Sequence, residues 1–121
     1  MSSANDIGFI TAAITGRDQF RATGTGAMSQ TLTATENLVI LSIALHLSAA
    51  GGATENFVAK VDADAGAAYD TVLISQDMAA TTDIYDNEPR YIAAGDDIDF
   101  TYTNTNGRTW GLTVQYGKVG T

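Results

Sequence analysis

The sequence predicts an all-β protein: a single antiparallel β-sandwich of the jelly-roll type, with about eight strands, preceded by an N-terminal arm. Two observations carry this prediction. Short segments in which apolar and polar residues alternate follow one another along most of the chain, with turn-forming Gly, Asn, Asp and Pro between them. No segment has the length and periodicity of a convincing helix. The 121 residues suit one domain with one core.

The segment 96–116 contains the clearest alternation. Its apolar residues recur at every second position in two runs: Ile98, Phe100 and Tyr102, then Trp110, Leu112, Val114 and Tyr116. We expect the two runs to form a β-hairpin around the loop 104–108, in which Thr103 pairs with Thr109. This register would set Tyr102 opposite Trp110 and bury one face of each arm.

The strands expected before this hairpin are short and closely spaced. They cover residues 28–34, 38–48, 57–61, 71–75, 84–86 and 91–93. The alanine-rich stretch 63–68 could suggest a helix, but Gly66 and the flanking Asp62 and Asp64 favour a loop.

The strand 38–48 is the most apolar of the set. One of its faces is wholly aliphatic and is predicted to line the core: Val39, Leu41, Ile43, Leu45 and Leu47. On the other face, Leu38 and Ile40 are large and apolar, while the remaining residues are small or polar. Either a loop or the N-terminal arm covers these two side chains, or they form a subunit interface. They are therefore the candidates for contacts between subunits.

Residues 1–26 differ from the rest of the chain and are predicted to form the arm, while residues 27–121 form the sandwich domain. The segment is rich in Ser, Ala, Thr and Gly and ends in a turn signal at 23–26. One interpretation is a short edge strand or a frayed tail. The other is an arm that docks on a partner, because its large apolar residues would otherwise lie in water. The anchors would be Phe9, Ile10 and Ile14.

Composition excludes several classes of function. The chain is 45% hydrophobic and only 17% charged, against about 25% in an average soluble protein, so part of its surface is expected to contact other protein. Six basic and 14 acidic residues give a net charge of −8, which opposes binding to nucleic acid. No cysteine is present for disulfides or thiolate sites. We expect no signal peptide, because the N-terminus lacks a positively charged region, and no membrane span, because no apolar run approaches about 18 residues.

Candidate catalytic groups are few, and we expect no enzyme activity, no metal and no cofactor. His46 is the only histidine, which excludes most zinc sites, and no Gly-x-Ser-x-Gly elbow accompanies it for a Ser-His-Asp triad. A surface or interface position is the simpler interpretation. Asp97 and Asp99 alternate onto one outer face of their strand, which favours a solvated face over a calcium site.

Aromatic residues provide the main alternative function. A stacking platform for a sugar ring could use Tyr69, Tyr85, Tyr91 and Trp110. Trp110 shares its face with Leu112 and Val114 and is expected in the core. Tyr85 and Tyr91 flank the loop 86–90 and are the sugar-binding candidates, so the alternative function is that of a lectin-like or tail-fibre carbohydrate-binding module.

Two segments resemble known jelly rolls. The sequence Ala93-Ala94-Gly95-Asp96-Asp97-Ile98-Asp99-Phe100 resembles the segment near the end of trimeric jelly rolls of the C1q and tumour-necrosis-factor type. The stretch 38–116, with Asn104-Thr105-Asn106-Gly107 before Trp110-Gly111-Leu112, is similar to small jelly-roll structural proteins of tailed bacteriophage virions, including capsid decoration proteins. Residues 1–26 match no family pattern.

This resemblance implies a non-enzymatic virion protein, a capsid decoration (cement) protein that forms a homotrimer and stabilises the head. Its partners would be copies of itself and the major capsid protein or another virion protein, with the N-terminal arm contacting the capsid. Leu38 and Ile40 would be the candidates for the trimer contacts. The protein would be made in the host cytoplasm and located in the virion. The resemblance does not distinguish a head location from a tail location.

Overall fold

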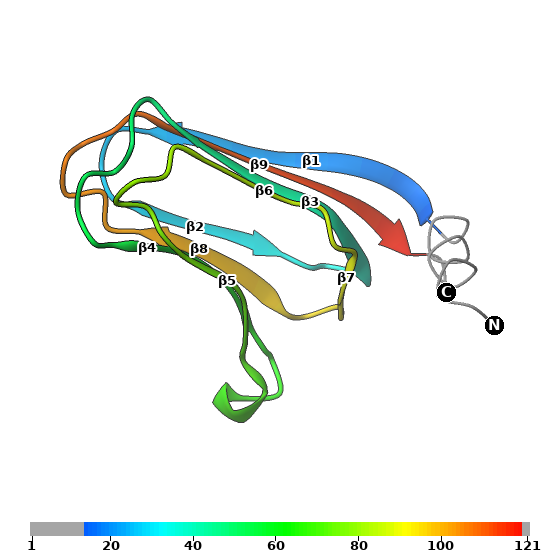
Figure 1. Ribbon diagram of the computed structural model, residues 1–121. Coiled ribbons are helices and arrows are strands. Elements are labelled where there is room, and N and C mark those ends of the chain that lie inside the picture. The colour runs from blue at the N-terminus through cyan, green and yellow to red at the C-terminus, as the bar shows by residue number, and fades with distance from the viewer. Residues whose placement is uncertain (1–13, 120–121) are drawn as a thin grey trace.

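The computed structural model describes residues 14–119 and shows an all-β sandwich, as the sequence predicted (Figure 1). These residues form nine strands and one short 3₁₀ helix: β1 (Ile14–Gly24), β2 (Met28–Thr33), β3 (Leu38–Leu47), β4 (Asn56–Asp62), η1 (Ala67–Tyr69), β5 (Thr71–Asp77), β6 (Asp83–Asp86), β7 (Arg90–Ile92), β8 (Asp97–Tyr102) and β9 (Trp110–Val119). The six strands predicted before the final pair agree with β2 to β7 within two residues at each end.

The strand order is that of a jelly roll. One sheet has the order β1-β9-β3-β6, with β7 also paired to β3, and the other has the order β2-β8-β4-β5. The antiparallel pairs β4–β5, β3–β6, β2–β8 and β1–β9 follow one another along one long hairpin, from its tip at β4–β5 to its open end at β1–β9. Rolling this hairpin up adds the pairs β3–β9 and β4–β8 and closes the two sheets over one core.

The predicted hairpin between β8 and β9 is wrong, although its buried face is correct. β8 lies in the four-stranded sheet and β9 in the five-stranded sheet, so Tyr102 pairs with Met28 and Trp110 pairs with Gly24 and Leu47. Of the seven residues predicted to share the buried face, Tyr116 is partly buried and packs against the core, and six are in the core: Ile98, Phe100, Tyr102, Trp110, Leu112 and Val114. Alternation identified the buried face correctly but could not show that the two strands belong to different sheets.

The loop between β8 and β9 is held by the buried Asn104. Its side-chain amide donates hydrogen bonds to the carbonyl oxygens of Thr25, Gly26 and Arg108, at 3.2, 3.0 and 2.9 Å, and its Oδ1 accepts one from the Arg108 N–H. The Trp110 indole N–H donates to the Gly26 carbonyl oxygen at 2.9 Å. The crossing between the two sheets is thereby tied to the turn between β1 and β2.

A β-bulge in β3 corrects the predicted faces of this strand. The pairing with β9 shifts register between Ile40 and Ser42, so Leu41 is the extra residue. Leu38 and Ile40 therefore point into the core before the bulge, and Ile43 and the odd-numbered residues that follow point into it after the bulge. Leu38 and Ile40 are 3% and 0% exposed. Their proposed role as trimer contacts is wrong, because the core covers them.

The boundary between arm and sandwich also differs from the prediction. Residues 14–24 form β1, which pairs with β9 along its whole length and is an edge strand of the five-stranded sheet. Phe20 on β1 packs against the core, 6.2 Å from Phe100 between ring centroids. The simpler interpretation, an edge strand, holds for this part of the chain. Ile14 begins β1 and packs against Gly117, whereas Phe9 and Ile10 lie outside the described residues.

Candidate functional site

The large apolar side chains that remain exposed in the described part of the chain lie along one lateral side of the sandwich but face two ways: Tyr85 and Tyr91 are on the outer face of the five-stranded sheet, and Val72, which pairs with Lys60, is on the outer face of the four-stranded sheet. They are Tyr69 (67% exposed), Val72 (54%), Tyr85 (70%) and Tyr91 (61%), on η1, β5, β6 and β7. β1 contacts β2 at one side of the sandwich, so the opposite edges, β5 and the β6–β7 pair, lie along the other side. The loop that carries η1 projects from the body there (Figure 1). We call these four residues the tyrosine side.

Carboxylates accompany the apolar residues of the tyrosine side. The Arg90 guanidinium lies 2.8 Å from the Asp86 carboxylate and 3.6 Å from that of Glu88, whose side chain is 78% exposed. Asp83 lies 2.5 Å from Nδ1 of His46, and this hydrogen bond, with a second one from Thr82, lowers the pKa of the Asp83 carboxyl. Acidic groups thus outnumber basic ones around the exposed tyrosines.

The opposite edge of the five-stranded sheet carries two arginines. Arg17 and Arg21 lie on the outer face of β1, because the alternate residues Phe20 and Ala22 face the core. Neither guanidinium forms an ion pair with any residue in the range 14–119. We call these two residues the arginine edge. Two of the chain's six basic residues thus lie on one strand without an ion pair to another described residue, which gives this edge a local positive charge.

Between these two edges, the outer face of the five-stranded sheet carries short side chains. The residues in its centre are short: Ala44 on β3, and Gly111 and Thr113 on β9. No atom lies within 4 Å of the position that a Cβ at Gly111 would occupy, and a hollow of about 310 Å³ lies over this glycine, beside Arg21 and Thr23. A glycine in the middle of a strand marks a place where another backbone or a ligand can approach closely.

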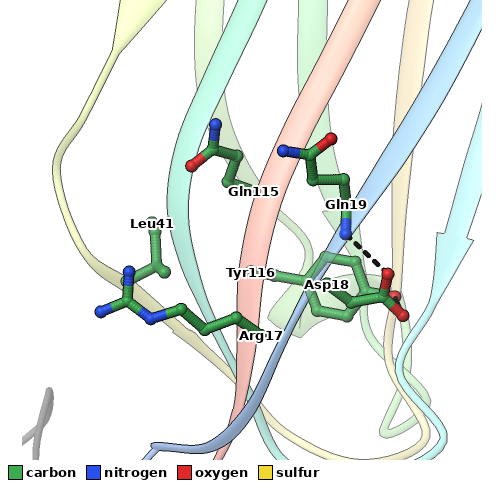
Figure 2. Close-up of a pocket in the computed structure, with 6 residues that line it drawn as sticks. All are labelled: Arg17, Asp18, Gln19, Leu41, Gln115 and Tyr116. Atoms are coloured by element: carbon green, nitrogen blue, oxygen red, sulfur yellow. Dashed lines mark hydrogen bonds between the residues drawn. The ribbon is translucent and has the colours of Figure 1, made fainter.

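A second hollow of about 200 Å³ lies where β1, β9 and the bulge of β3 meet. Figure 2 shows Arg17, Leu41 and Gln115 on one side of the β1 and β9 ribbons, and the Asp18 carboxylate and the Tyr116 ring on the other. Burial, and then the neighbouring Asp18 carboxylate, raises the pKa of the Tyr116 hydroxyl. Because the polar groups point to both sides of the sheet, they do not converge on a common point as catalytic groups must.

The other candidate residues lie apart from one another. His46 is exposed and pairs with Asp83, and no serine hydroxyl among the described residues hydrogen-bonds to it. Asp97 and Asp99 face outward as predicted, on the central strand β8, where Asp99 accepts a hydrogen bond from Thr31. Within residues 14–119, no group of three or more acidic or histidine side chains could hold a metal ion. Trp110 is in the core, as its parity predicted.

Sequence reasoning identified Tyr85 and Tyr91 as exposed but missed the arginine edge. The signal was present: within 14–24, Arg17, Gln19 and Arg21 alternate with residues that face the core. The assignment of this stretch to an arm hid that alternation. In the described range of the chain, no helix has the length and hydropathy needed to cross a membrane.

Comparison with known proteins gives no family assignment. No protein-family model matches the chain, and the curated proteins contain no significant match. Among solved structures, the chain is similar to the Drosophila NLP core, described for its pentamer formation and histone binding. The identity is 14% over 81% of this chain and 96% of that one, with a TM-score of 0.44.

A second similarity is to the virus-like particle of extra small virus (XSV) of the giant freshwater prawn Macrobrachium rosenbergii. Here the identity is 12% over 89% of this chain and 83% of that one, with a TM-score of 0.28. Both TM-scores are below 0.5, so neither likeness carries an argument about function.

Proposed function

We propose that this protein is a non-enzymatic structural subunit of a virion: a homotrimeric decoration protein of a tailed-bacteriophage head. The observation that carries the proposal is the tyrosine side, where three exposed tyrosines and a valine lie on one side of a small sandwich. Tyrosine is enriched at protein interfaces and depleted on ordinary solvent-facing surface. The low charge of the chain and its resemblance to phage jelly-roll proteins support the same role.

A decoration protein needs a stable fold and contact surfaces, and it needs no reaction centre. Binding across the junctions between capsid subunits stabilises a shell because expansion or rupture must first separate those contacts. The described residues fit this role, since they enclose one buried core and leave apolar side chains exposed that could contact other subunits.

Two measurements test the proposal. Multi-angle light scattering of the purified protein should give a mass of about 38 kDa, three times the 12.6 kDa of one chain. The protein should also cosediment saturably with heads assembled from the major capsid protein of the same virus. Failure to bind such heads at any concentration would refute the decoration role.

A carbohydrate-binding module is the second candidate, because Tyr85 and Tyr91 are both exposed on the outer face of the five-stranded sheet. They pair with Ala44 and Val39, five positions apart on β3, so they lie roughly 15 Å from one another along the strand. A single sugar ring cannot stack on both, and only an oligosaccharide could span them. A glycan array tests this candidate, with loss of binding in a Tyr85→Ala variant as the supporting result.

A further inference from the structure

We infer that the tyrosine side of one subunit docks on the arginine edge of a second copy of the same chain. The inference rests on the self-association in the proposed function and adds the two surfaces that meet. The contact would be heterologous, with different patches on the two subunits, as a closed ring of three identical chains requires.

Charge complementarity selects this pairing over the two symmetric ones. Around Tyr85 and Tyr91 lie the carboxylates of Asp83, Asp86 and Glu88, against the Arg90 guanidinium and the His46 imidazole, and beside Tyr69 the Asp70 carboxylate pairs with Lys60. Packing the tyrosine side on its own copy would bring two acidic patches together. Packing two arginine edges together would oppose unpaired guanidinium groups. Only the mixed contact places Arg17 and Arg21 beside acidic side chains, and like-charge contacts suppress the alternatives.

The exposed area of the tyrosines is a substantial part of the area that a protein interface needs. Tyr85 and Tyr91, which are each about two thirds exposed on the same outer face, present roughly 280 Å² of surface. A standard interface takes about 800 Å² from each partner, so these two side chains would supply about a third of one partner's share. On the receiving side, Gly111 and Thr113 lie beside Arg21 in the hollow over β9, which leaves room for bulky side chains.

The contact would use side chains and not extend a sheet. At the tyrosine side, the edge of the five-stranded sheet consists of two strands of four and three residues, β6 and β7, separated by a break that contains Pro89. A short, interrupted edge with proline is a poor template for backbone pairing with another strand. Tyrosine and arginine side chains are the usual energetic anchors of an interface of this kind.

The test uses two double variants that each disable one patch. Arg17→Glu with Arg21→Glu removes the arginine edge, and Tyr85→Ser with Tyr91→Ser removes most of the tyrosine side. All four positions are exposed, and circular dichroism verifies that each variant folds. We expect each variant alone to have its self-association weakened at least roughly 30-fold and to show the mass of one chain at concentrations where the wild type assembles.

The decisive sample is the equimolar mixture, measured by native mass spectrometry. The arginine variant keeps its tyrosine side and the tyrosine variant keeps its arginine edge, so one intact interface can form between them. We expect a 1:1 heterodimer that grows no further. Thr101→Glu, on the outer face of β8 in the other sheet, is the charge control and should assemble like the wild type. If charge reversal prevents folding, Arg17→Gln with Arg21→Gln replaces it.

Three results would overturn the inference: a wild type that stays monomeric, a double variant that assembles like the wild type, or a mixture that contains no heterodimer. The assay uses the isolated protein, whereas the decoration role is tested by binding to heads. The two can therefore fail independently: heads could bind a protein whose subunits meet through other surfaces.

Discussion

At the scale of single residues, Asn104 shows how a polar side chain can determine a local chain path. Its φ of 55° lies in the left-handed region, which asparagine tolerates better than most residues. The side chain is 4% exposed, and three carbonyl oxygens from two different loops accept hydrogen bonds from its single amide group. No apolar residue of the same size could satisfy those carbonyls, so this position contributes to stability through hydrogen bonding rather than apolar burial.

Replacing Asn104 by Ala should destabilise the fold by about 2–4 kcal/mol, because it leaves buried carbonyl groups unpaired and forces alanine into a positive φ. Urea denaturation measures the change. Asn104→Gly, which adopts this φ freely, should recover the backbone part of the loss only. Asn106→Ala is the control: this exposed residue donates one hydrogen bond, to Gly51, and its loss should cost under about 1 kcal/mol. Equal losses at the two positions would contradict this account.

At the scale of elements, β1 is part of the sandwich and not an appendage. It pairs with β9 from Ile14 to Gly24, and its inward residues Phe20 and Ala22 pack against the core. Its backbone hydrogen bonds satisfy the outer edge of β9, which contributes Trp110, Leu112 and Val114 to the core. Without β1, that edge and those side chains would face water.

Deleting residues 1–26, the whole predicted arm, should therefore unfold the protein or cause it to aggregate. A chain that begins at Ile14 keeps every described strand and is the matched control, and we expect it to retain the β-sheet signal. Far-UV circular dichroism and size-exclusion chromatography distinguish the outcomes. A folded, monodisperse protein lacking residues 1–26 would show that the sandwich begins at β2, as first predicted.

At the scale of the whole molecule, unfolding is coupled to proton binding through two tyrosines. Burial raises the pKa of the Tyr102 hydroxyl, with the Glu55 carboxylate as a further contribution, and burial also raises that of Tyr116. In the unfolded chain both would ionise near pH 10. The fold favours the neutral hydroxyls, so this contribution to stability is complete below about pH 10 and is lost as the pH rises above it.

The free energy of unfolding should accordingly fall as the pH is raised from about 9.5 to 11. The double variant Tyr102→Phe with Tyr116→Phe should lose much of this dependence, because phenylalanine has no proton to release. Urea titrations across the range measure the slope. Tyr85→Phe is the control, since its side chain lies in water in both the folded and the unfolded protein. An unchanged slope in the double variant would refute the assignment.

The sequence by itself determined the fold class, the bounds of most strands and the buried face of the last two. The alternation of apolar and polar residues with period two is a local pattern that the sequence alone shows, and turn residues mark where each strand stops. The exposure of Tyr85 and Tyr91 was also predictable, because both flank a turn that contains Pro89.

Only the tertiary structure decided which strands pair and which surfaces are free. β8 and β9 are adjacent in the chain but belong to different sheets, because rolling the long hairpin places consecutive strands on opposite sides of the core. One extra residue at Leu41 turned Leu38 and Ile40 inward, and a bulge leaves no trace in a period-two pattern. The tyrosine side and the arginine edge likewise exist only after folding, since residues 69–91 and 17–21 reach opposite edges through sheet order alone.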